Sequence, residues 1–194
     1  MADKVTSAIL VGVGGQGTIL VSKILTYGLS SAGYDVKMSE VHGMSQRGGS
    51  VSTEVRWGDK VYSPLIGKGA ADIMVAFEKM EALRYAEQLK PGAIAVINDY
   101  SIESSTTAAG LEKYPEGVLE AMQNYTRCFI FNAEAIAVKL GNPKCMNVVL
   151  FGAMAKVLGL VAIDWEKIIS DVVPAKLRDL NLQAYRAGRD AVQI

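Results

Sequence analysis

The feature that most constrains the fold is an apolar run followed at once by a glycine-rich turn and an amphipathic segment. Residues 8–13 are apolar, Gly12-Val13-Gly14-Gly15-Gln16-Gly17 closes the run, and apolar residues then recur at helical spacing over 18–32. A continuous apolar run that ends in glycines is typical of a buried parallel strand. With a further short strand expected at 35–39, the first 40 residues predict a βαβ unit.

The rest of the chain alternates strand and helix signals, with one departure. Residues 51–57 and 60–65 alternate polar and apolar side chains around a Gly58-Asp59 turn, which predicts an antiparallel hairpin. Further strands are expected at 71–77, 93–98 and 127–131, and helices at 79–89, 117–125, 133–140, 144–158, 164–172 and from Pro174 onward. The predicted fold is α/β, a Rossmann-like, mostly parallel sheet with helices on both faces, an inserted β-hairpin and a helical C-terminal third.

Composition narrows the class of protein. The chain has 194 residues, of which 50% are hydrophobic and 21% are charged, so a single globular domain over 1–194 is expected. Twenty basic residues balance twenty acidic ones, which argues against nucleic-acid binding and against attraction to an anionic membrane. No apolar run approaches the roughly 20 residues that a membrane-spanning helix needs.

The cysteines bear on both location and cofactors. Cys128 and Cys145 are the only two, they lack CxxC spacing, and no basic and apolar leader is recognised, so a cytoplasmic protein without disulfides is expected. An iron–sulfur cluster normally takes four cysteine ligands, which this chain alone does not supply. Both cysteines are interpreted as small core residues.

The glycine turn fits G-x-G-x-x-G, a pattern that binds dinucleotide phosphates at a helix N-terminus. Glu40 stands near the place of a ribose-binding acid. The same glycines would also serve a tight turn and close helix packing without any ligand. Because a hairpin is predicted where the next βα unit should be, we expect a Rossmann-like turn without tightly bound NAD. The turn positions kept as candidate ligand residues are Gly12, Gly14, Gly15, Gln16 and Gly17.

A second candidate segment, the loop at 39–50, is polar, rich in glycine and too irregular for a helix or a strand. It holds the only histidine, His42, which could act as a general base or serve as a hydrogen-bonding residue. Arg47 could clamp a phosphate or a carboxylate, with an interface arginine as the alternative. The loop residues kept as candidates for a ligand or partner contact are His42, Met44, Gln46, Arg47, Gly48 and Gly49.

Other groups that could carry chemistry are few. Glu78 follows a predicted core strand, either as a carboxylate at the open edge of the sheet or as the cap of the next helix. The sequence offers no triad, metal cluster or carboxylate pair, and no magnesium-binding segment of the kind that a thiamine diphosphate site needs. We therefore do not expect this chain to carry out chemistry alone.

The glycine turn and the segment Ser39–Val51 together resemble the gamma-type domain of 2-oxoacid:ferredoxin oxidoreductases. Within that family, the beta-subunit type of the indolepyruvate enzymes is most similar. Matching pieces continue through residues 61–66, 71–78, 81–85 and 89–92. The resemblance covers most of the chain and is strongest before Asn98.

The resemblance implies a subunit without tightly bound cofactors. In that family a large partner subunit is understood to hold thiamine diphosphate, magnesium and the iron–sulfur clusters. A 2-oxoacid loses carbon dioxide there, coenzyme A takes the acyl group, and electrons pass to ferredoxin. The implied substrate is an aryl pyruvate such as indolepyruvate, with a branched-chain or simple 2-oxoacid left open.

The implied assembly is a hetero-oligomer with the large subunit, and a homodimer is open for the isolated chain. Two other interpretations of the function stay open. One is an independent nucleotide-dependent oxidoreductase that uses the glycine turn. The other is a regulatory or interaction module on the same fold.

Overall fold

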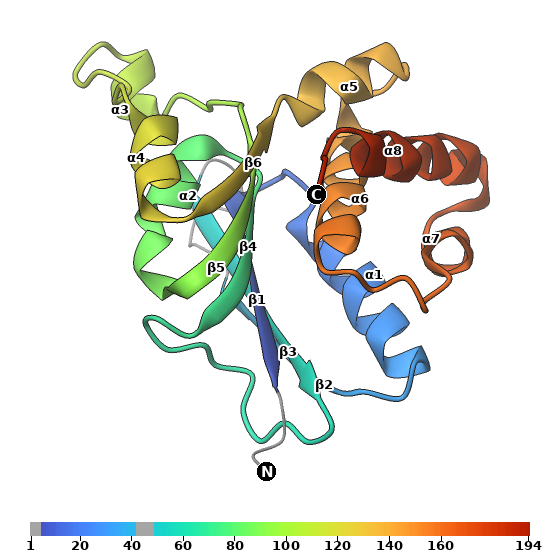
Figure 1. The fold of residues 1–194 in the computed structure, drawn as a ribbon. Helices are drawn as coiled ribbons and strands as arrows, with labels where there is room; N and C mark the ends of the chain where they lie inside the picture. Colours follow the sequence, from blue (N-terminus) through green and yellow to red (C-terminus); the bar gives the residue numbers. More distant parts are fainter. Residues whose placement is uncertain (1–4, 42–48) are drawn as a thin grey trace.

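The computed structural model describes residues 5–41 and 49–194 and forms one mixed six-stranded sheet between two layers of helices (Figure 1). The strand order is β2-β3-β1-β4-β5-β6. The strands that run parallel side by side are β1 (Thr6–Val13), β4 (Ala71–Ala76), β5 (Leu89–Asn98) and β6 (Arg127–Phe131). Their apolar sequences fit strands that are covered on both faces, so the predicted α/β class is confirmed.

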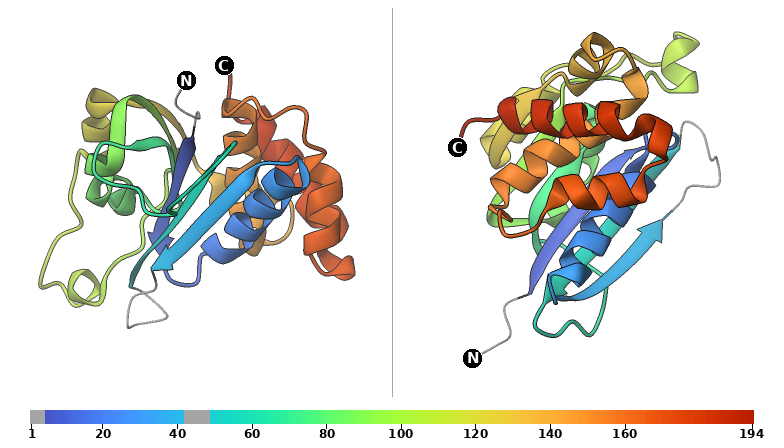
Figure 2. Two further views of the ribbon diagram at one scale, coloured as in Figure 1. Left: turned by 90° about the horizontal axis from the view of Figure 1, so that it is seen from below. Right: turned by 90° about the vertical axis from the view of Figure 1, so that its right-hand side faces the viewer.

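The two helix layers are separated clearly in the left view of Figure 2. One face is covered by α1 (Thr18–Ser31), α5 (Ala133–Lys139), α6 (Met146–Val157), α7 (Trp165–Val172) and α8 (Arg178–Asp190). The other face carries α2 (Lys79–Arg84) and α4 (Val118–Tyr125), with the short α3 (Ser105–Ala108) beyond them. Alternate residues of β1 enter the two cores, Leu10 on the α1 face and Ile9 on the α2 face.

The predicted hairpin is wrong, because residues 60–65 form no strand. β3 (Ser50–Gly58) pairs antiparallel with β1 on one side and with β2 (Asp35–Val41) on the other. β2 therefore stays parallel to β1 with β3 between them, and the first βαβ unit is split. Within 60–65 only Val61 is buried, at 2% exposed, and its N–H donates to Asp35 at 2.9 Å, while Tyr62 and Leu65 are exposed.

The boundary between α2 and β5 also differs from the prediction. The helix expected over 79–89 ends at Arg84, a 3-10 turn follows at Ala86–Gln88, and β5 begins at Leu89. Lys90-Pro91-Gly92 thus lies inside a strand rather than after a helix. The pairing of β4 with β5 shifts register there, and such an irregularity accommodates a proline and a glycine.

The helical C-terminal third is confirmed, and two of its helices begin at side-chain caps. Asn132 accepts the N–H of Ala135 at 2.7 Å at the start of α5, and Asp164 accepts that of Lys167 at 3.1 Å at the start of α7. Within residues 5–41 and 49–194, no helix has the length and apolar character needed to cross a membrane.

Candidate functional site

The candidate site lies at the carboxyl edge of the parallel strands, the usual ligand-binding edge of α/β sheets. β1 ends there in the glycine turn. Gly15 and Gly17 adopt φ of 101° and 82°, a conformation that favours glycine whether or not a ligand is bound. A Cβ on Gly12 would lie 2.9 Å from the Cβ of Phe77. Strand packing therefore explains Gly12, and turn geometry explains Gly15 and Gly17. The fourth glycine, Gly14, donates its N–H to the carbonyl of Gly49.

Both ends of the Gln16 side-chain amide bond to the protein backbone. Its Oε1 accepts the N–H of Val13 at 2.7 Å, and its Nε2 donates to the carbonyl of Phe77 at 2.9 Å. Asn98, fully buried at the end of β5, donates to the same carbonyl at 3.0 Å and accepts the N–H of Ala133 at 2.8 Å. Two neutral amides therefore fix the ends of β1, β4 and β5 relative to one another.

A pocket of about 700 Å³ opens beside the glycine turn, within the size range of small-molecule sites. The N-termini of α1 and α6 both line it; the N-cap residue of neither helix caps it with a side chain, and in α6 the N–H of Val148 is bonded by Asn147 Oδ1. Helix N-termini carry partial positive charge, and Lys144 adds a full one. This side of the pocket therefore suits an anionic group.

Tyr100 and Glu134 also line the same pocket. The pKa of Tyr100 is raised, first by burial and then by the Glu134 carboxylate, with which it forms a hydrogen bond. This phenol therefore stays protonated and acts as a hydrogen-bonding group at neutral pH.

Asn147, near the start of α6, is a pocket residue that the sequence analysis did not single out. Its Nδ2 donates to the carbonyl of Gly17 at 3.2 Å. A weak signal was present, because Asn147 is a polar residue at the start of the apolar segment 144–158. Only the fold shows that this segment returns to the glycine turn.

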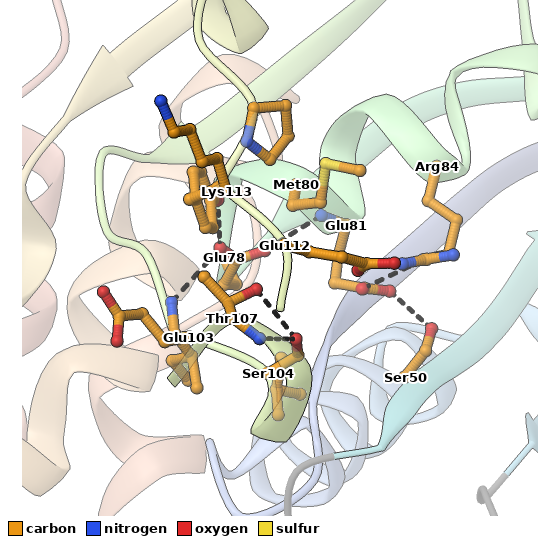
Figure 3. A pocket seen from close by; sticks show the side chains of 14 residues that line it. Ser50, Glu78, Met80, Glu81, Arg84, Glu103, Ser104, Thr107, Glu112 and Lys113 are labelled. Atoms are coloured by element: carbon orange, nitrogen blue, oxygen red, sulfur yellow. Dashed lines mark hydrogen bonds and ion pairs between the residues drawn. The ribbon is translucent and has the colours of Figure 1, made fainter. Parts of the chain in front are cut away.

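A second, smaller pocket of about 210 Å³ lies on the α2 face of the same edge (Figure 3). Glu78, which is 1% exposed, accepts the N–H of Glu81 at 3.0 Å, so its interpretation as a helix cap is confirmed. It also accepts the N–H of Ile102 at 3.3 Å and the hydroxyl of Tyr114. The pKa of Tyr114 is raised, first by burial and then by this hydrogen bond.

The contacts of Glu81 reach the end of the polar loop. Glu81 is 4% exposed; it accepts the hydroxyl of Ser50 and, at 3.1 Å, the Nε–H of Arg84 (Figure 3). Ser50 begins β3, and the preceding Gly49 accepts the N–H of Gly14 at 2.9 Å. The described end of the loop therefore lies directly against the glycine turn, so the structure joins these two candidate segments.

Tyr114→Phe is expected to lower the free energy of unfolding by about 1–2 kcal/mol, because the buried Glu78 carboxylate loses a charge-assisted hydrogen bond but keeps two backbone donors. Urea denaturation would measure the change. Tyr62→Phe is the matched control, since Tyr62 is 87% exposed. Equal stability of the two variants would contradict this role of Tyr114.

The other candidates from the sequence are placed as follows. Glu40 accepts the hydroxyl of Ser22 on α1 at 3.1 Å. Because β3 separates β2 from β1, Glu40 lies two strand spacings, about 10 Å, from β1 and not at the adjacent position of a ribose-binding acid. The remaining loop candidates lie outside the described residues: His42, Met44, Gln46, Arg47 and Gly48.

The two cysteines lie on opposite faces of the sheet. Cys145 is 3% exposed in the core of the α1 face, and Cys128 packs against the core of the α2 face. Burial raises the pKa of Cys128 to about 11 and also raises that of Cys145. Cys145 is a core thiol as expected, and Cys128 is partly buried against the core. Among the described residues, no group of three or more His, Cys, Asp or Glu side chains could hold a metal ion.

Comparison with known proteins places these features in a family context. The model of the family described as pyruvate ferredoxin/flavodoxin oxidoreductase matches residues 7–191. Indolepyruvate oxidoreductase subunit IorB of Pyrococcus horikoshii is 38% identical over 193 residues, which cover 95% of this chain and 95% of that protein.

Solved structures show the same fold. The gamma subunit of a keto/oxoacid ferredoxin oxidoreductase from Geobacter sulfurreducens has a TM-score of 0.71 at 23% identity, over 96% of this chain and 97% of that one. The 2-oxoglutarate:ferredoxin oxidoreductase of Magnetococcus marinus, solved with 2-oxoglutarate, coenzyme A and succinyl-CoA bound, has a TM-score of 0.74 at 20% identity. That match covers 97% of this chain and 31% of that longer chain.

Proposed function

This chain belongs to the pyruvate ferredoxin/flavodoxin oxidoreductase family as a small subunit of a 2-oxoacid:ferredoxin oxidoreductase, and we propose that its complex acts on indolepyruvate or another aryl pyruvate. The proposed reaction is oxidative decarboxylation, in which the acyl group passes to coenzyme A, carbon dioxide leaves and ferredoxin takes the electrons. The 38% identity to an indolepyruvate oxidoreductase subunit supports this choice of substrate. A cytoplasmic location is part of the proposal.

The observation that carries a binding role is the pocket of about 700 Å³ at the carboxyl edge. Coenzyme A bears several phosphate groups, and helix N-termini with a nearby lysine are a recurrent way to bind phosphate. The N-termini of α1 and α6 and Lys144 provide this combination. We therefore assign the phosphates of coenzyme A to these helix N-termini and Lys144, close to Gly49, whose carbonyl accepts the N–H of Gly14 in the turn.

The proposal includes a division of labour between the subunits. Thiamine diphosphate would supply the electron sink for decarboxylation and iron–sulfur clusters would carry the electrons, and we assign both to the larger partner subunit, with magnesium. We assign to this chain the binding and positioning of coenzyme A by Lys144, the helix N-termini and the glycine turn. Recombining it with the large subunit and assaying acyl-CoA formation from indolepyruvate tests the proposal.

The glycine turn raises a second candidate function, an independent nucleotide-dependent oxidoreductase, and we expect the isolated chain not to bind NAD or NADP. β3 holds Glu40 one strand too far from β1, and Glu40 is engaged with Ser22. Isothermal titration at micromolar dinucleotide would measure this, with a Rossmann-type dehydrogenase as positive control. Saturable binding would favour the independent enzyme.

A further inference from the structure

We propose that Asn147 is a positioning residue for coenzyme A, because it holds the glycine turn at a fixed separation from the N-terminus of α6. The inference rests on the proposed function, since it takes coenzyme A as the occupant of the larger pocket. In this proposal Asn147 affects coenzyme A binding indirectly, by fixing the position of the glycine turn.

The contacts of Asn147 join segments 130 residues apart. Its side-chain Nδ2 donates to the carbonyl of Gly17 at 3.2 Å, and its Oδ1 accepts the N–H of Val148 at 2.8 Å. Gly17 is the N-cap of α1, and Asn147 is the second residue of α6. One side chain therefore connects the two helix N-termini that face the pocket.

The contact between Asn147 and the turn requires a glycine. A Cβ on Gly17 would lie 2.3 Å from Nδ2 of Asn147, so the turn approaches Asn147 more closely than a residue with a side chain allows. The hydrogen bond opposes movement of the turn away from α6. Because the positive ends of α1 and α6 must contact one ligand together, a fixed separation between them prepares the pocket for its phosphates.

The setting of Asn147 argues for a specific role. It is 5% exposed, and its neighbours Met146 and Val148 are buried apolar residues. Burying an amide costs free energy unless its hydrogen bonds are made, and an apolar residue would fill the same space without that cost. An apolar side chain, however, could not form the directional hydrogen bond by which Asn147 holds the carbonyl of Gly17.

Asn181 provides a matched control on the same face of the protein. It is 6% exposed, and its Nδ2 donates to the carbonyl of Leu177 at 2.8 Å. It therefore matches Asn147 in residue type, burial and kind of acceptor. Its bond is local, because Leu177 is the N-cap residue of α8, and Asn181 does not line the pocket.

The test measures steady-state kinetics with varied coenzyme A on complexes of the large subunit with the native chain, Asn147→Ala or Asn181→Ala. We expect Asn147→Ala to raise the KM for coenzyme A on the order of tenfold, with kcat at saturation within about twofold of native. Asn181→Ala should leave both constants unchanged while lowering the melting temperature by a similar amount. If Asn147→Ala does not assemble, Asn147→Ser keeps a polar group that is favourable at a helix N-terminus and should raise the KM in the same direction.

A KM for coenzyme A that is unchanged in both Asn147 variants, or that rises equally in Asn181→Ala, would overturn the positioning role. A failure of the proposed function gives a different result, because the native complex itself would then show no dependence on coenzyme A.

Discussion

Gly188→Ala is expected to destabilise the protein by about 3 kcal/mol, near the upper end for overpacked cores. A Cβ at position 188 would lie 1.8 Å from the carbonyl oxygen and 2.7 Å from the carbonyl carbon of Val149. These are backbone atoms of α6, so no rotamer change relieves the overlap. Since Gly188 lies in α8, the helices α6 and α8 would have to separate. Since α6 also carries Asn147, a shift of α6 is expected to reach the pocket of about 700 Å³ beside the glycine turn, where we propose that coenzyme A binds.

Urea denaturation followed by circular dichroism would measure this loss. Gly67→Ala is the matched control, because Gly67 is exposed, has no positive φ, and its added Cβ would meet nothing within 4 Å. The control should unfold at the native urea concentration. If Gly188→Ala also unfolded at the native urea concentration, the close approach of α6 and α8 would not be a constraint on the fold.

Much of the fold could be predicted from the sequence because its signals are local. The parallel strands are runs of apolar residues, and 71–77 and 127–131 each match an observed strand within one residue. Caps such as Asp164 mark the start of a helix within a few residues of sequence. Local patterns of this kind need no knowledge of the partner element.

Strand pairing could not be predicted in the same way. An alternating segment such as 51–57 shows that one face is buried but not which strand lies beside it. β3 lies between β1 and β2, and this makes the first βαβ unit a split one. The segment 60–65 alternates in sequence but forms no strand, and Val61 is its only buried residue.

The site shows the same limit. The sequence identified the glycine turn as a candidate, but not that Gln16 would bond to Phe77, 61 residues away, or Asn147 to Gly17, 130 residues away. Bonds over such distances leave no periodic trace in a sequence. The contact between Gly14 and Gly49 likewise joins two segments that the sequence indicated separately.

The motifs of the sequence indicated the family that the comparisons then showed. From this membership we expect the chain to be inactive alone. Decarboxylation of a 2-oxoacid needs an electron sink such as thiamine, and transfer of the electrons needs a cluster. The sequence has two cysteines, and they lie on opposite faces of the sheet. In our proposal, the contribution of this chain is the carboxyl edge with the glycine turn and the larger pocket.

The decisive measurement is reduction of a viologen dye with indolepyruvate and coenzyme A, run on this chain, on the large subunit and on their mixture, with 2-oxoglutarate as the comparison substrate. We expect no reduction by this chain alone, at most weak reduction by the large subunit, and full activity from the mixture with a clear preference for indolepyruvate. Dye reduction by this chain alone would contradict its role as a subunit without redox cofactors. Full activity of the large subunit alone would show that this chain takes no part in the reaction.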